Sequence, residues 1–354
     1  MARSIVISVD YEIFGNGTGD VRQHVIEPTE RMCRIAGKHG VPITMFFEME
    51  EYLQFERHAD ELGRSLGYDP AEEMRRQAAD LARRGHDIQL HLHPQWHEAR
   101  REGGEWQLHH DRLTVDALFE SQEETTEYMR QRKEALEAIS GKPVTAYRAG
   151  GFAAQPGGRL LRALQETGFA IESSVVKGMQ HSRPHPLDYR SAPEGRRLWR
   201  ISEEVSTEDA DGTLWEIPVH SETGRRYQQL TFNRFKAKFS RNVPKARQRE
   251  MMDQLGVKAS PLSLLSFLGQ RVPIKLDYHN LTPSTLHRMI TRAPAPPPGD
   301  LDVLVLIGHT KEHTDDGAFE AFLKRIAADP SIQVVSFSEL AQRLARSEVA
   351  TIPN

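Results

Sequence analysis

The sequence predicts a single α/β domain in which buried strands alternate with amphipathic helices along the whole chain. Short aliphatic runs, such as residues 5–9 and 301–307, are typical of parallel strands that are buried on both faces. Segments with helical spacing of apolar residues separate these runs, and no Pro/Gly-rich linker divides the 354 residues into two halves of similar character. We therefore expect one domain spanning residues 1–354.

Composition sets limits on partners and compartment. With 38% hydrophobic and 27% charged residues, the chain can bury a substantial core, and its net charge of -4 gives no overall attraction to nucleic acid or anionic membranes. The single cysteine, Cys33, excludes an intrachain disulfide, and its apolar neighbours predict a buried helix position. The first strand-like run, residues 5–9, is too short for the apolar core of a secretory signal, and no run is long enough to cross a membrane. A cytoplasmic protein is expected.

In the first half of the chain, helix stop signals mark where each strand begins. Gly40 ends a helix that Pro28 opens, Gly85 ends a second helix, and Gly141 with Pro143 ends a third. Between them lie apolar runs of strand length. The predicted strands are 4–9, 43–47, 87–92 and 144–147, and the predicted helices are 28–40, 71–84 and 116–139.

The second half continues the alternation. Gly168 ends another helix, Thr282 and Pro283 open the next, and residues 177–197 are expected to form a long loop. The predicted strands are 169–175, 214–219, 274–279, 301–307 and 332–336, and the predicted helices are 160–167, 282–290, 318–327 and 339–346.

An insertion is expected at about residues 221–270. Residues 225–249 contain nine Lys or Arg and no Asp or Glu, with Phe232, Phe235 and Phe239 at helical spacing. The simpler interpretation is an amphipathic helical excursion with solvated charges, and the alternative is a binding face for an anionic group such as phosphate, sulfate or uronate.

The run 85–97 carries the strongest chemical pattern. Within its alternating apolar segment, His91 and His93 share one face of the strand, and Pro94 ends regular pairing. Two imidazoles on one face at a strand end suit a metal site that takes a carboxylate from elsewhere. His97 could join them if the chain turns back after Pro94.

Other polar residues also stand at or just beyond the ends of apolar strands. They are Asp10, Glu12, Arg148, His279 and His309. Strand order cannot be obtained from periodicity, so an open sheet and a closed barrel both remain, but barrel enzymes gather catalytic groups at strand ends in this way. Arg148 could instead be a buried ion-pair partner, and His309 a hydrogen-bonded core histidine.

In order along the chain, several motifs resemble those of the polysaccharide deacetylases with a NodB homology domain, carbohydrate esterase family four. These are Ser-Val-Asp-Tyr-Glu at 8–12, Gly-His-x-Ile-x-x-His at 85–91, Tyr-Arg-Ala-Gly-Gly at 147–151 and Leu-Ile-Gly-His at 306–309, with the strands at 43–47 and 168–175 and the closing strand and helix at 334–340. The run Leu-His-Leu-His-Pro at 90–94 is similar to a branch associated with bacterial surface-polysaccharide synthesis.

The resemblance implies a distorted (β/α) barrel of about seven parallel strands and metal-assisted removal of acetyl groups from N-acetylated sugars. It implies roles for matching positions: Asp10 as general base, Arg148 as the group that orients it, and His309 as general acid. Glu12 and His91 would be metal ligands, and a divalent ion, expected to be Zn²⁺ with Co²⁺, Ni²⁺ or Fe²⁺ as alternatives, would occupy the site.

Two departures from the family pattern affect the metal site. The family commonly has a second histidine four residues after the first, where this chain has Gln95, and its first motif usually has paired aspartates where this chain has Tyr11 and Glu12. His93 is our choice for the replacement ligand, and His97 is the runner-up.

The expected function is a metal-dependent N-deacetylase for a sugar of a bacterial surface polysaccharide, such as O-antigen or capsule, or of its anionic precursor. Two alternatives stay open: a carbon-nitrogen hydrolase acting on a small non-sugar amide, and a non-catalytic carbohydrate-binding barrel. The candidate substrate-binding residues are Trp96, Tyr147, Phe152 and His279.

Overall fold

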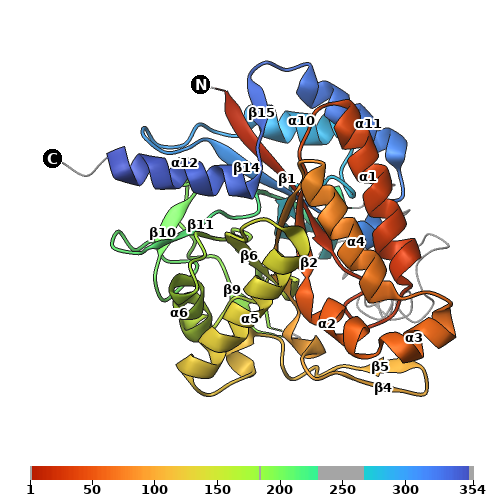
Figure 1. Ribbon diagram of the computed structural model, residues 1–354. Helices are drawn as coiled ribbons and strands as arrows, with labels where there is room; N and C mark the ends of the chain where they lie inside the picture. The colour runs from red at the N-terminus through yellow and green to blue at the C-terminus, as the bar shows by residue number, and fades with distance from the viewer. Residues whose placement is uncertain (1, 183–184, 230–266, 351–354) are drawn as a thin grey trace.

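The computed structural model describes residues 2–182, 185–229 and 267–350. Its centre is one large sheet surrounded by helices (Figure 1). The strands of this sheet are β1 (Arg3–Tyr11), β2 (Thr44–Glu48), β3 (Asp87–Leu92), β6 (Ala146–Ala149), β7 (Ile171–Glu172), β10 (Trp199–Ile201), β11 (Leu214–Glu216), β14 (Val303–His309) and β15 (Ile332–Val334).

The sheet is mostly parallel and curls toward closure. Its order is β10-β11-β7-β6-β3-β2-β1-β14, with β15 also paired to β1, and within the described residues only the β10–β11 pair is antiparallel. Val219 forms parallel bridges with both Val176 and Val305, so the chain after β11 links the far side of the sheet to β14. The predicted α/β fold with a distorted barrel is confirmed, with seven parallel strands from β11 to β14 along this order.

Helices cover the outside of the curl (Figure 1). They are α1 (Glu27–Lys38), α2 (Met49–Arg57), α3 (Ala59–Leu66), α4 (Pro70–Arg83), α5 (Gln122–Ser140), α6 (Gly158–Glu166), α10 (Pro283–Arg292) and α11 (Asp316–Ala327). The last helix, α12 (Phe337–Ala350), instead packs against the smaller apolar cluster described next. Cys33 is buried in α1 with a free thiol, as predicted.

Two apolar clusters form the core because alternate residues of each strand point to opposite faces. In β1, Ile5, Ile7 and Val9 belong to the larger cluster, which packs against the outer helices, and Val6 belongs to the smaller one with Phe337 of α12. The even-numbered residues of β1 therefore face the inside of the curled sheet.

Four predicted elements are shorter than the sequence suggests: the helix 116–139 and the strands 169–175, 214–219 and 332–336. Two of them show the reason. The helix expected from residue 116 begins at Gln122, because Ser121 caps it and the Asp116 carboxylate instead accepts the backbone N–H groups of Arg159 and Leu160. The strand expected at 169–175 ends at Glu172, whose carboxylate accepts the backbone N–H of Ser174.

Among the residues that the structure describes, three small antiparallel ladders lie outside the main sheet. They pair β4 (Arg100–Glu102) with β5 (Glu105–Gln107), β8 (Gln180–His181) with β9 (Leu187–Asp188), and β12 (Ser221–Arg225) with β13 (Arg271–Lys275). The last ladder flanks the expected insertion, and the basic segment with Phe232, Phe235 and Phe239 lies mainly outside the described residues.

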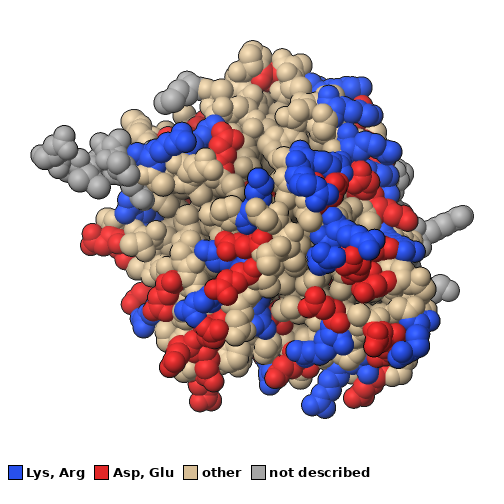
Figure 2. Space-filling view, viewed as in Figure 1, with Lys and Arg blue, Asp and Glu red and all other residues tan. Residues whose placement is uncertain are grey.

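Charges of both signs are interspersed on the face shown in Figure 2, and this face carries no continuous basic patch. On α4, neighbouring turns pair Arg75 and Arg76 with Glu72, and Arg83 with Asp80. Among the described residues, no helix combines the length and the apolar character needed to span a membrane.

Candidate active site

The predicted site residues converge because the neighbouring parallel strands end at the same edge of the sheet, where these side chains point to its inner face. Cα register pairs Asp10 of β1 with His309 of β14, and His91 of β3 with Arg148 of β6. Glu12 follows directly after β1 and is 4% exposed. The structure thus brings Asp10, Glu12, His91, Arg148 and His309 to one place, with His93 one residue beyond the end of β3.

A buried ion pair fixes the orientation of Asp10. The fully buried Arg148 donates from NH1 to Asp10 Oδ1 at 2.7 Å, from NH2 to Ser8 Oγ at 3.0 Å, and from Nε to the backbone oxygen of Ser173 at 3.0 Å. Burial by itself would raise the pKa of Asp10, but Arg148, His91 and His309 outweigh it and hold this pKa below its usual value. Asp10 is therefore an ionised carboxylate near neutral pH.

His309 lies between two carboxylates. Its Nε2 is 3.5 Å from Asp10 Oδ2, and its Nδ1 is 3.4 Å from Glu312 Oε2. Burial acts against the charged ring, but Glu312 and Asp10 outweigh it and raise the pKa of His309. The ring is thereby suited to carry a proton that it can give up.

Glu12 is the centre of a second group of ligating side chains. Its Oε2 lies 2.6 Å from His93 Nε2 and 3.6 Å from His91 Nε2, and its Oε1 accepts a 2.6 Å bond from Lys311 Nζ. Burial opposes the charge on Glu12, but Lys311 and His93 outweigh it and hold the pKa well below its usual range. Glu12 is therefore an anion facing two imidazoles.

The two histidines differ in how their far nitrogen is held. His91 Nδ1 lies 2.8 Å from the backbone oxygen of Arg148, which only accepts, so Nδ1 carries the hydrogen and Nε2 presents a lone pair. That Nε2 is buried and makes no hydrogen bond among the described residues. A buried imidazole nitrogen aimed at a carboxylate and a second imidazole suits metal ligation.

His93 Nδ1 lies 3.0 Å from the Gln95 side-chain amide. With the amide nitrogen donating, as placed, the hydrogen of His93 sits on Nε2 and bonds to Glu12. Turning the Gln95 amide by 180° puts its oxygen there, moves the hydrogen to Nδ1 and frees Nε2, at the loss of the 3.4 Å bond that the amide nitrogen donates to the backbone oxygen of Gly15. Gln95 thus contacts the site through His93.

The donor set fits a divalent ion. Glu12, His91 and His93 offer ligand atoms within 4.8 Å of one another, and so do Asp10, Glu12 and His309. In the first group, His91 Nε2 is a buried nitrogen whose lone pair has no hydrogen-bond partner among the described residues, and the group's two nitrogens and one carboxylate match zinc ligation with a position left open.

Two glycines allow the close packing of the site. A Cβ on Gly150 would come within 2.5 Å of the His93 ring, and a Cβ on Gly308 would come within 2.5 Å of the Tyr278 ring and 2.8 Å of His279. Any side chain at Gly150 would push His93 away. Glycine is therefore required here by the close contact with the His93 ring and not by an unusual backbone conformation.

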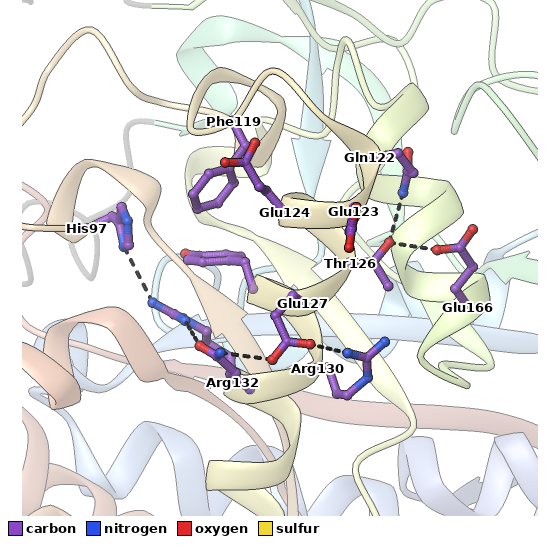
Figure 3. Close-up of a pocket in the computed structure, with 12 residues that line it drawn as sticks. His97, Phe119, Gln122, Glu123, Glu124, Thr126, Glu127, Arg130, Arg132 and Glu166 are labelled. Carbon is purple, nitrogen blue, oxygen red and sulfur yellow. Dashed lines mark hydrogen bonds and ion pairs between the residues drawn. The ribbon is translucent and has the colours of Figure 1, made fainter.

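His97 lies apart from Glu12. Its Nδ1 is 3.3 Å from Glu50 Oε2 and 3.4 Å from Arg132 NH2, and Arg132 Nε also donates to Glu50 at 2.6 Å. Figure 3 shows His97 and Arg132 at one end of a groove along α5, whose opposite end is lined by Gln122 and Glu166. The turn after Pro94 therefore carries His97 into a separate ion-pair cluster.

The candidate substrate-binding residues have different surroundings. Trp96 is 1% exposed and packs against Phe55 and Trp106, and Tyr147 is fully buried in β6. Phe152 is partly exposed, with Lys275 Nζ 4.4 Å from its ring centre, and its φ of 62° is unusual for a bulky residue. A direct substrate contact for these residues stays a prediction.

Sequence reasoning missed Lys311 and Glu312, which contact Glu12 and His309. Both follow the aliphatic strand β14 within η6 (Thr310–Glu312), so their position just beyond a strand end was the available signal. It also missed Glu48 and Glu51, which accept the backbone N–H groups of His93 and Ile13. In the sequence, both glutamates look like ordinary polar residues at the start of a surface helix, so no local pattern marks them as part of the site.

No protein-family model matches the chain, and a search of curated proteins finds no match. Among solved structures, a putative polysaccharide deacetylase from Mycobacterium smegmatis is similar at 15% identity, 98% coverage of this chain, 92% coverage of that chain and a TM-score of 0.48. A probable polysaccharide deacetylase from Pseudomonas aeruginosa PAO1 has 11% identity, coverages of 98% and 92% and a TM-score of 0.47. A PuuE allantoinase has 11% identity, coverages of 100% and 92% and a TM-score of 0.46. At these scores, the fold assignment rests on the sheet order and closure described above.

Proposed function

We propose that the protein is a metal-dependent hydrolase that removes N-acetyl groups from a sugar of a bacterial surface polysaccharide or of its anionic precursor. The observation that carries the proposal is that two sets of polar residues lie side by side at one edge of the sheet. Glu12, His91 and His93 form a ligand set, and Asp10 with Arg148 and His309 forms an acid-base set beside it.

In the proposed site, Glu12, His91 and His93 hold the divalent ion, with Zn²⁺ the expected metal. When bound, such an ion polarises an amide carbonyl and makes a water molecule more acidic. Lys311 keeps Glu12 ionised, and the backbone oxygen of Arg148 keeps the lone pair of His91 on Nε2.

The acid-base steps belong to the chain itself. Asp10, held ionised by Arg148, takes a proton from the attacking water, and His309 gives a proton from Nε2 to the amine nitrogen as the carbon-nitrogen bond breaks. The balance is one N-acetyl amide plus one water giving one amine and one acetic acid, and the proton taken by Asp10 restores that lost by His309.

A polar cavity supports a hydroxylated substrate. It has a volume of about 140 Å³, adjoins His309 and is lined by Gln229, Ile274, Lys275, Asp277, Asn280, Leu281 and Glu312. Lys275 also lies over Phe152, which offers an apolar ring next to a positive charge. This combination supports a sugar that bears an anionic group, and the strained backbone of Phe152 supports a functional role for that residue.

The first test is metal content. Protein purified without chelator should contain near-stoichiometric zinc, iron, cobalt or nickel, and a His91→Ala, His93→Ala double variant should lose it. A His97→Ala variant is the matched control, because His97 belongs to the Glu50 cluster, and it should keep the metal. Wild-type protein that stays metal-free after reconstitution with several divalent ions contradicts the proposed mechanism.

The second test is acetate release from N-acetylated sugars, free and nucleotide- or lipid-linked, compared between wild type and Asp10→Asn. The variant should lose turnover and keep ligand binding. Turnover of a small non-sugar amide alone would support the carbon-nitrogen hydrolase alternative. Sugar binding without turnover in the metal-loaded wild type would support the carbohydrate-binding alternative.

A further inference from the structure

A chain of buried hydrogen bonds leads from the backbone of His309 to the surface, and the proposed chemistry uses none of it. The His309 N–H donates to His279 Nδ1 at 3.2 Å, His279 Nε2 lies 3.3 Å from His313 Nδ1, and His313 Nε2 lies 2.8 Å from Asp316 Oδ1. His279 is 8% exposed and His313 is 3% exposed. We call these three residues the His279–His313–Asp316 chain.

The two ends of this chain determine the hydrogen position on both rings. A backbone N–H only donates, so His279 Nδ1 accepts and the single hydrogen of the neutral ring is on Nε2. That hydrogen is donated to His313 Nδ1, which places the hydrogen of His313 on Nε2. A carboxylate only accepts, so Asp316 completes the chain, and all its bonds point in one direction.

Both rings are neutral near pH 7. Burial, together with His313, lowers the pKa of His279 well below its usual value, and burial lowers the pKa of His313 to about 4 although Asp316 opposes this. The geometry agrees. A second hydrogen on His279 would face the His309 N–H across 3.2 Å, and a second hydrogen on His313 would face the Nε2–H of His279 across 3.3 Å.

Two helices hold the outer end of the chain in place. Asp316 is the first residue of α11, and Arg31 of α1 donates from Nε to Asp316 Oδ1 at 3.1 Å. Arg31 also donates from NH2 to the backbone oxygen of His313 at 3.1 Å. The chain therefore ties the end of β14 to two helices.

The inner end of the chain, at the His309 N–H, affects the orientation of the His309 side chain and does not supply it with protons. It reaches the peptide N–H of His309, and a peptide N–H does not pass protons to the ring of its own residue during turnover. What it fixes is the peptide plane between Gly308 and His309, against which the Tyr278 and His279 rings are packed. That plane sets the direction in which the His309 side chain leaves β14.

We propose that the His279–His313–Asp316 chain is a positioning device that aims the His309 imidazole at Asp10 and at the leaving amine. The inference rests on the proposed function, in which His309 is the general acid. His279 is then a positioning residue behind the site, in place of the substrate contact expected from the sequence.

Two amide variants of His279 distinguish the loss of the hydrogen-bond acceptor from a change in side-chain size. In His279→Asn the side-chain oxygen can occupy the place of Nδ1 and still accept the His309 N–H, whereas in His279→Gln the amide lies near the place of Nε2 and that acceptor is lost. We expect kcat for acetate release to fall about tenfold more in His279→Gln than in His279→Asn, the usual size of an outer-contact effect, with KM little changed. His110→Gln, at an exposed loop position, is the control and should match wild type.

Two measurements test the chain without turnover. With ¹⁵N-labelled histidine, nuclear magnetic resonance should show the hydrogen on Nε2 of both His279 and His313. Hydrogen exchange of the His309 amide should be faster in His279→Gln than in His279→Asn.

The outcomes distinguish this inference from the proposed function. Active wild-type protein with equal loss of kcat in the two amide variants, or with the hydrogen of His279 on Nδ1, overturns the positioning device and leaves the deacetylase intact. Metal-loaded wild-type protein that releases no acetate overturns the proposed function and with it the catalytic purpose of the chain, whatever the tautomers are.

Discussion

Arg148 and Asp10 are 138 residues apart in sequence and form a 2.7 Å ion pair in which neither side chain is more than 4% exposed. Two charges removed from water in this way stabilise each other only while both are present. The pair also aligns Asp10 from behind, since Ser8 and the backbone of Ser173 take the other guanidinium nitrogens.

Replacing Arg148 by Met is expected to lower the free energy of unfolding by about 3–5 kcal/mol, because Asp10 is left as an uncompensated buried charge. Urea denaturation at pH 7 measures this. The exposed Arg83–Asp80 pair gives the matched control, and Arg83→Met should cost at most about 1 kcal/mol. In an Asp10→Asn, Arg148→Met double variant the two losses should be less than additive. Additive losses would show that the pair does not act as a unit.

Gly150→Ala is expected to weaken metal binding at least about tenfold while the fold is kept, because the new methyl group would displace the His93 ring. Calorimetric titration of zinc into the chelator-treated protein measures the affinity. Gly158→Ala is the control, since a Cβ there meets nothing within 4 Å. Unchanged affinity in Gly150→Ala would remove His93 from the ligand set.

Gln95 offers a test of how His93 is oriented. Gln95→Glu supplies a carboxylate that can only accept from His93 Nδ1, which keeps the lone pair on Nε2, so zinc affinity should rise about tenfold. Gln95→Leu removes the partner and should lower affinity by a similar factor. A ranking in which Leu binds zinc more tightly than Glu would contradict this role for Gln95.

The buried His86 should make stability depend on pH. Burial, aided by Arg84, lowers its pKa from 6.5 to about 4, and its Nδ1 accepts the Ile43 N–H. Since the folded-state pKa is the lower one, the unfolded chain binds more protons between these values, and stability falls as pH falls from 6.5 toward 4. The loss from pH 7 to pH 4.5 should be about 2–3 kcal/mol.

His86→Asn keeps a side-chain acceptor for the Ile43 N–H and cannot be protonated, so it should flatten this part of the pH profile. Urea denaturation at several pH values compares it with wild type and with the exposed His110→Gln. Parallel profiles for wild type and His86→Asn would show that His86 does not cause the dependence.

Most of the fold could be predicted because its strands are short aliphatic runs between clear helix stop signals. The ends of some strands are shifted from their predicted positions, because side chains there form the hydrogen bonds that neighbouring backbone would otherwise form. Hydrophobic periodicity carries no information about such bonds. For example, β6 begins at Ala146 and not at residue 144, because the Gln89 side-chain oxygen accepts the N–H groups of Thr145 and Ala146. This shift moves Arg148 from the expected turn into the strand itself.

The site was predictable as a set of strand-end residues, and its finer contacts were not. Face alternation placed His91 and His93 together, and the structure puts both beside Glu12. The separate position of His97, and the contacts of His313 and Asp316, depend on loop paths after a strand ends. No local pattern encodes such paths.

The register that places Asp10 beside His309 has a consequence for biosynthesis. β1 is made before the other strands of this sheet, and its β14 partner is made almost 300 residues later, so that edge of β1 waits unpaired for roughly 15–60 s at ordinary elongation rates. Asp10 and His309, the acid-base pair of the proposed mechanism, meet only when β14 docks. A chain that ends before β14 therefore has an open strand edge on β1 and lacks His309, the general acid of the proposed mechanism.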